Sequence, residues 1–134
     1  MSVKWEVDRS LVDQEFAADI DCVLGASEYA WAIVQGFRTA AQQEAIEKTG
    51  VQAAAVGHSA HEYGLAVDVA ILVSGKETWA YGSAAWPWLW AACFGHPRLH
   101  SGHFFPPAAP ADEDHIQAVK WYVKRAELKA EGKW

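Results

Sequence analysis

Residues 58–73, HSAHEYGLAVDVAILV, decide how the rest of the chain is interpreted. The second half of this stretch is rich in β-branched residues and follows Gly64, which favours a loop entering a strand over a helix. Successive side chains of a strand point to opposite faces, so the valines and isoleucine share one face and Asp68 shares the other with alanines. The bulky face can pack against helices. The small face leaves room for a cleft around the carboxylate.

Asp68 lies in the middle of this aliphatic run, where a buried carboxylate needs a cation or several hydrogen-bond donors. His61 lies seven residues earlier, and imidazole and carboxylate are both ordinary Zn²⁺ ligands. A catalytic zinc needs three protein ligands and an open position for water, so a third donor must come from elsewhere. We predict His115 as that donor. We predict Asp112, three residues before it, as a general base that takes a proton from water.

Arg38 follows the apolar segment WAIVQGF of residues 31–37, which reads as a strand. On that strand Arg38 falls on the smaller face, which directs it toward the same cleft as Asp68. Two interpretations stay open: an ordinary surface arginine, or a planar donor to a polarised carbonyl oxygen or a substrate carboxylate. A capping box, Thr39 to Gln42, predicts that a helix begins directly after Arg38.

Three motifs in a fixed order resemble one known family. They are GFRTAAQQ at residues 36–43, SAHEYGLAVD at residues 59–68 and DEDH at residues 112–115. The second is similar to the Ser-x-His-x-x-Gly-x-Ala-x-Asp signature of zinc D,D-carboxypeptidases and L-alanyl-D-glutamate peptidases, which include the vancomycin-resistance D,D-peptidases and many phage endolysins. The third is similar to that family's acidic residue, two variable residues and histidine, and the first to its arginine before a glutamine-bearing helix. The resemblance covers roughly residues 31 to 118.

The resemblance implies a site, a metal and a reaction. One Zn²⁺ would be held by His61, Asp68 and His115, with Asp112 as the base, Arg38 as a catalytic or substrate-binding donor, and Ser59 as a substrate contact. The expected activity is that of a zinc metallopeptidase that cleaves the L-Ala–D-Glu bond of the bacterial peptidoglycan stem peptide, as a phage endolysin does.

Two alternatives remain open at this point. Within the same family, the chain could be a D-alanyl-D-alanine carboxypeptidase or dipeptidase. In a different class, it could be a zinc-containing binding domain without catalysis, because the Hedgehog signalling domain resembles this family. The presence of both Asp112 and Arg38 favours an enzyme.

Length and composition indicate one ordered domain. With 134 residues, 51% of them apolar and 21% charged, the chain is expected to form a single domain spanning residues 1–134. The mixture of predicted helices and strands makes the expected fold class α+β. We expect helices packed on a small, mainly antiparallel sheet that carries the zinc cleft, in a monomer. The net charge of −6 argues against nucleic acid as a partner. No apolar run reaches the ~18 residues of a membrane helix, and the N-terminus does not resemble a signal peptide. We therefore expect synthesis in the cytoplasm of the host and action on the cell wall after release.

Three further features have competing interpretations. The basic segment after Lys120 is interpreted as a solvated helix, with contact to an anionic envelope as the alternative. Cys22 and Cys93 are interpreted as buried free thiols, with a single disulfide as the alternative. His100 and His103 are interpreted as loop residues, with an approach to the metal or substrate as the alternative.

The expected elements follow from periodicity and capping signals. We predict helices over about 11–24 (capped by Ser10), 40–48, 84–94 and 120–131, and strands over 31–37, 66–73, about 78–81, about 98–101 and 115–119.

Overall fold

The computed structural model describes residues 3–50, 54, 57–105 and 111–132. These residues form a six-stranded sheet in the order β1-β2-β3-β6-β5, with β4 paired to β3 outside this path. The strands are β1 (Val3–Trp5), β2 (Ala30–Gln35), β3 (Ala66–Val73), β4 (Lys76–Thr78), β5 (Leu99–Ser101) and β6 (His115–Ala118). The helices are α1 (Gln14–Gly25), α2 (Ala40–Lys48), α3 (Ala85–Phe94) and α4 (Trp121–Ala130), with 3-10 turns η1 (Arg9–Leu11), η2 (Ala60–Tyr63) and η3 (Gly102–Phe104).

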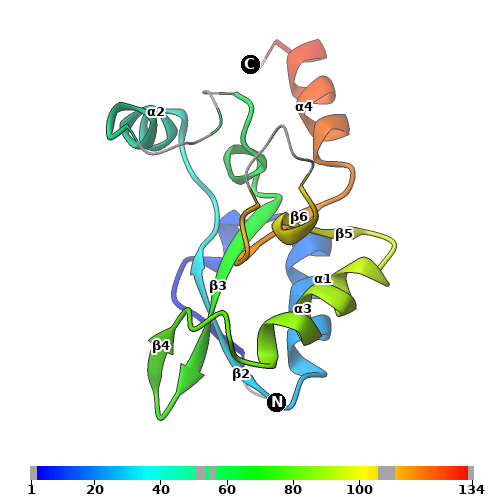
Figure 1. Cartoon of the computed structure of the whole chain (residues 1–134). Coiled ribbons are helices and arrows are strands. Elements are labelled where there is room, and N and C mark those ends of the chain that lie inside the picture. Colours follow the sequence, from blue (N-terminus) through cyan, green and yellow to red (C-terminus); the bar gives the residue numbers. More distant parts are fainter. Residues whose placement is uncertain (1–2, 51–53, 55–56, 106–110, 133–134) are drawn as a thin grey trace.

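The sheet is mainly antiparallel, as predicted. β1 pairs with β2 in parallel, whereas β3 runs antiparallel to β2, β4 and β6, and β5 runs antiparallel to β6. The predicted single α+β domain is therefore confirmed in its fold class. Strand β3 has the bounds expected from its alternating pattern, and it pairs with three other strands, which makes it the central strand of the sheet (Figure 1).

The core lies on one face of β3. Val67, Val69 and Ile71 are buried there in one hydrophobic cluster with the inward faces of α1 and α3. In Figure 1 these two helices lie together on one side of the strands, and α2 lies apart from them. Within the core the rings of Trp31 and Trp86 meet edge to face, with centroids 5.4 Å apart. Because α1 and α3 cover this face, they leave uncovered the opposite face, which carries Asp68.

The first helix begins later than its pattern predicts. Residue Asp8 accepts hydrogen bonds from the backbone N–H and the hydroxyl of Ser10, which closes the separate turn η1. Helix α1 is capped instead by Asp13, whose Oδ2 accepts from the Phe16 N–H at 3.1 Å. The prediction that Ser10 caps this helix is therefore wrong, and Leu11, the first residue of the predicted helix, lies in η1 and is 55% exposed. The two local hydrogen bonds that Asp8 accepts stabilise the separate turn at these residues in place of a longer helix.

Most of the remaining elements lie close to their predicted positions, but β1 was not predicted. Thr39 and Gln42 form the predicted capping box of α2, whereas the strand predicted over about 78–81 shares only Thr78 with β4. Ser83 accepts from the Ala85 N–H, but the residue at the cap position of α3 is Ala84. None of the helices in the described part of the chain is long and apolar enough to cross a bilayer.

The two cysteines are free and do not pair. Cys93 is buried as predicted, and burial raises the pKa of its thiol to about 12. The other prediction of a buried thiol is wrong, because Cys22 is exposed on the outer face of α1. The predicted basic helix is α4, on which Lys124 and Lys129 are exposed. Its contact with an anionic envelope stays a prediction.

Candidate metal centre

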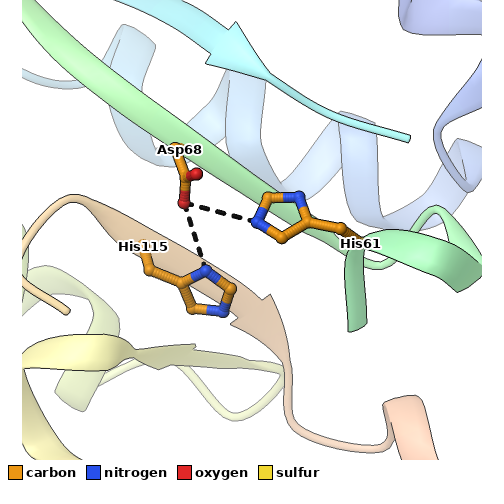
Figure 2. A group of neighbouring side chains, drawn as sticks. All are labelled: His61, Asp68 and His115. Atoms are coloured by element: carbon orange, nitrogen blue, oxygen red, sulfur yellow. Dashed lines mark hydrogen bonds and ion pairs between the residues drawn. The ribbon is translucent and has the colours of Figure 1, made fainter. Parts of the chain in front are cut away.

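Three side chains from separate elements converge on the face of the sheet that α1 and α3 leave uncovered. His61 comes from η2, Asp68 from β3 and His115 from β6, and one donor atom from each lies within 4.8 Å of the others (Figure 2). The sheet register places Asp68 directly opposite His115. The Asp68 Oδ1 atom lies 3.4 Å from His61 Nε2 and 3.2 Å from His115 Nδ1. The structure therefore brings together the three side chains predicted as metal ligands.

Each imidazole is held by a second partner that leaves the inward nitrogen free to donate to a metal. His61 Nδ1 donates to the carbonyl oxygen of Gly36 at 2.8 Å, so its lone pair is on Nε2. His115 Nε2 donates to the Gln117 side-chain oxygen at 2.9 Å, so its lone pair is on Nδ1. Such outer hydrogen bonds fix the tautomer and orientation of metal-binding histidines.

The spacing of the donors fits zinc. Bonds of roughly 2.0–2.2 Å in a tetrahedron place neighbouring ligand atoms about 3.3 Å apart, and both measured spacings to Asp68 are close to this value. Two imidazole nitrogens and one carboxylate oxygen are also the donor types that zinc accepts. Three protein donors leave a tetrahedral ion one position for water or substrate.

The electrostatics of the group favour an ionised carboxylate. Burial alone would raise the pKa of Asp68, but the positive charge of a protonated His61 and the hydrogen bond that a protonated His115 donates outweigh it and hold that pKa well below its ordinary value. Burial acts in the opposite direction on His115, yet the hydrogen bond and charge of Asp68 raise the pKa of this imidazole. A proton and a metal therefore compete for His115, while Asp68 stays negative.

A capping box shapes η2, the 3-10 turn that precedes β3 and carries His61. Ser59 Oγ accepts from the His61 N–H, and the Glu62 carboxylate accepts from the Ser59 N–H. Gly64 then turns the chain at φ +67°, where a Cβ atom would lie 2.8 Å from the Leu11 carbonyl oxygen. Ser59 thus has a structural task at the entrance to η2, and its predicted contact with substrate stays a prediction.

Arg38 lies beside the carboxylate, as predicted, but it is not part of a strand: β2 ends at Gln35 and its register shifts between Ile33 and Gln35. Its Nη2 atom is 3.9 Å from Asp68 Oδ2, and its backbone N–H donates to the His61 carbonyl oxygen at 3.0 Å. The side chain is oriented by Gln43, which is fully buried, accepts from Arg38 Nη1 at 2.9 Å and donates to the Ala54 carbonyl oxygen at 2.6 Å. The guanidinium is thereby held at the edge of the metal centre, 13% exposed.

Asp112 lies next to the group without being one of its three members. Its Oδ2 atom is 3.8 Å from His115 Nδ1, and its side chain is 51% exposed, so solvent and substrate can reach it. Gly102 packs against this turn so closely that a Cβ atom there would lie 2.2 Å from the Asp112 carbonyl oxygen. Asp112 therefore lies beside the three donors with an exposed carboxylate, and its role as general base stays a prediction.

Two groups near the site were not identified from the sequence. Asp114 lies with Asp68 and Asp112 in a second cluster of donor atoms. Burial, the Asp68 charge and a hydrogen bond with Asp112 raise the pKa of Asp114 to about 8. Burial and the Asp114 and Asp112 charges also raise the pKa of Tyr81 to about 12, which keeps its hydroxyl a donor beside these carboxylates.

His100 and His103 have partners outside the metal centre. His103 Nδ1 donates to Glu113 Oε2, and the ring of His100 stacks on that of Phe105. Neither belongs to the cluster of His61, Asp68 and His115. His100 lies in β5 and His103 in η3, so the interpretation of both as loop residues is wrong.

Comparisons with known proteins identify the fold. Neither a protein-family model nor a curated protein matches the sequence. Among solved structures, the L-Ala–D-Glu endopeptidase ChiX of Serratia marcescens has a TM-score of 0.68 at 21% identity, over 87% of this chain and 86% of that chain. The vancomycin-resistance D,D-dipeptidase VanXYg, solved with a D-Ala-D-Ala phosphinate analog, has a TM-score of 0.63 at 15% identity, over 90% of this chain and 55% of that one. The D,D-pentapeptidase VanY from a VanB-type cassette, solved as an E175A mutant with Zn(II), has a TM-score of 0.59 at 18% identity, over 90% and 79%.

At these identities the likeness shows a shared fold. The resemblance read from three sequence motifs is therefore confirmed at the level of the fold, because the solved structures with that fold include the same classes of peptidoglycan peptidase.

Proposed function

We propose that the chain is a zinc-dependent peptidase that hydrolyses the stem peptide of bacterial peptidoglycan. The observation that carries the proposal is the convergence of His61, Asp68 and His115 at tetrahedral spacing, with Asp112 and Arg38 at its edge. The shared fold supports it, since the similar structures are a peptidoglycan endopeptidase and vancomycin-resistance peptidases. A zinc ion held by these three donors would act as a Lewis acid that polarises the scissile carbonyl and makes a water molecule more acidic.

The protein's own side chains perform the proton transfers and hold the substrate. The Asp112 carboxylate takes a proton from the attacking water and returns it to the leaving amine. Its exposure and the 3.8 Å distance from its Oδ2 atom to His115 Nδ1, one of the proposed metal donors, suit this role. Arg38 either stabilises the developing oxyanion or binds a substrate carboxylate, with its fork directed by Gln43.

The proposed scissile bond is that between L-Ala and D-Glu. The sequence motifs resemble those of phage endolysins with this activity, and the endopeptidase ChiX has the same fold. We therefore propose an endolysin made in the host cytoplasm that acts on the wall after release. Cleavage at D-Ala–D-Ala is the alternative, favoured by the shared fold of the D,D-peptidases.

Digestion of purified peptidoglycan tests the proposal directly. Zinc-loaded protein should release fragments with a new D-Glu amino terminus, identified by mass spectrometry, whereas a new D-Ala terminus would assign the alternative bond. Asp112→Ala should lower kcat by roughly 10²–10⁴-fold, the usual contribution of a general base, while zinc remains bound. A zinc-loaded wild-type protein that cleaves neither peptidoglycan nor stem peptide would instead assign the chain to the class of binding domains. An Asp112→Ala variant with full activity would remove Asp112 from the mechanism.

A further inference from the structure

The turn between Asp112 and His115 is held by contacts from two elements that contribute nothing to the metal centre itself. Glu113, the second residue of this turn, accepts a hydrogen bond on its carboxylate from His103 Nδ1 of η3 at 2.5 Å. Its backbone carbonyl oxygen accepts a second one from Trp90 Nε1 of α3 at 2.9 Å. The rings of Trp90 and His103 stack with centroids 3.8 Å apart and planes 2° from parallel. These three side chains thus form one connected unit around a single residue of the turn.

We propose that Trp90, His103 and Glu113 are positioning residues that aim the Asp112 carboxylate at the reacting water. This inference rests on the proposed peptidase function. We call the three residues the turn clamp. They act through the backbone of the turn, because their contacts are with one another and with the carbonyl oxygen of Glu113.

The position of Asp112 depends on its backbone to an unusual degree. An aspartate has only two side-chain torsions, so its carboxylate cannot reach far to compensate for a displaced Cα atom. The side chain is 51% exposed, its Oδ2 atom lies 3.8 Å from His115 Nδ1, and it shares a hydrogen bond with the Asp114 side chain. These partners lie in the turn or at its end, so the direction of the carboxylate follows that of the turn.

The residues on either side of Glu113 are also held by hydrogen bonds, whereas Glu113 itself is held by α3 and η3. The Asp112 N–H donates to the Gly102 carbonyl oxygen at 3.0 Å, and the Asp114 carbonyl oxygen accepts from the Val69 N–H at 3.0 Å. These two bonds fix the ends of the segment to η3 and β3. The turn clamp fixes its middle to α3 and η3, so its loss lets the middle move while the metal donors stay on their strands.

Two substitutions remove the clamp in different ways. Glu113→Ala deletes the acceptor, and His103→Phe keeps a flat ring on Trp90 but deletes the donor. Each should lower kcat on peptidoglycan by about 10- to 100-fold, the scale of a displacement of about 1 Å, with KM within about twofold and zinc stoichiometry unchanged. The double variant should be no slower than either single one, because both remove the same bond.

The conservative variant Glu113→Gln separates positioning from charge. Glutamine keeps an oxygen acceptor for His103 Nδ1, so its kcat should return to within about threefold of wild type. Phe94→Ala is the matched control: Phe94 is 79% exposed and packs on Phe104 of the same 3-10 turn, with ring centroids 5.4 Å apart. It should leave kcat unchanged.

The outcomes distinguish the two proposals. If the wild type is active and folded Glu113→Ala or His103→Phe keeps its kcat, the clamp proposal is overturned and the function stands. The clamp proposal is also overturned if Glu113→Gln is as slow as Glu113→Ala, since the negative charge of Glu113, and not the position of the turn, would then set the rate. If Glu113→Ala does not fold, the comparison of His103→Phe with Glu113→Gln still decides. A zinc-loaded wild type without cleavage overturns the proposed function itself.

Discussion

Gly102→Ala should damage catalysis although residue 102 bears no reactive group. A Cβ atom at this position would lie 2.2 Å from the Asp112 carbonyl oxygen and 3.0 Å from the Cβ atoms of both Asp112 and His115. Non-bonded contacts become favourable only near 3.5 Å, so the turn must retreat by about 1 Å. The backbone hydrogen bond from the Asp112 N–H to the Gly102 carbonyl oxygen, 3.0 Å long, would be strained by the same movement.

A displacement of about 1 Å of a catalytic group costs on the order of 10²-fold in rate, which corresponds to about 2.7 kcal/mol in the activation free energy. Overpacking should also lower the free energy of unfolding by about 1–3 kcal/mol. The assay is kcat on purified peptidoglycan, measured together with zinc content and the thermal midpoint. Gly25→Ala is the control, because a Cβ atom there meets no atom within 4 Å. A folded, zinc-loaded Gly102→Ala protein with the rate of the wild type would refute the reasoning, since the turn would then tolerate the movement.

Three further predictions concern the metal and the thiols. Removing zinc with a chelator should lower Tm, because an ion that binds only the folded chain stabilises it by about 2.7 kcal/mol at a free concentration of 100 Kd. Apparent zinc affinity should fall as the pH drops, because protons compete with zinc for His115. The fall should begin at a higher pH than for an ordinary histidine, since the pKa of His115 is raised. Titration calorimetry at several pH values checks this, and a pH-independent affinity between pH 5 and pH 8 would contradict it. Under native conditions an alkylating reagent should modify Cys22 alone, because Cys93 is buried and burial raises the pKa of its thiol to about 12. After denaturation both cysteines should react. Mass spectrometry gives the number of alkylated cysteines, and two in the native protein would refute the prediction.

The central strand was predictable because its signal is local. The alternation around Asp68 fixes both the bounds of β3 and the face on which its carboxylate lies. The same alternating pattern does not reveal that β6 pairs with β3. His115 was chosen because an acidic residue precedes it by three positions, and only the pairing of β3 with β6 shows that it lies directly opposite Asp68. Strand register across 47 residues depends on the whole sheet, which no local pattern contains.

The supporting residues were harder to predict than the donors. Gln43 orients Arg38, yet the capping box of α2 uses the adjacent Gln42, so the local signal pointed to the wrong glutamine. Gly102 and His103 resembled ordinary residues of a loop rich in histidine and proline. Their roles come from close approach to the turn at Asp112, ten residues along the chain, and such contacts between loops leave no periodic trace in the sequence.

The arrangement of the donors also explains why the metal centre and the fold depend on each other. His61 is oriented by a carbonyl oxygen at the end of β2, Asp68 belongs to β3, and His115 is oriented from within β6. All three strands must therefore pair in the correct register before the donor atoms converge, and an unfolded chain contains no comparable site. Zinc affinity is consequently a measure of the pairing of β2, β3 and β6, because the free energy of binding is gained only once those pairs have formed. The hydrophobic core lies on the other face, where α1 and α3 pack on the valines and isoleucine of β3. The sheet thus separates the two tasks: one face supplies the stability that holds the register, and the other uses that register to place the donors of the metal centre.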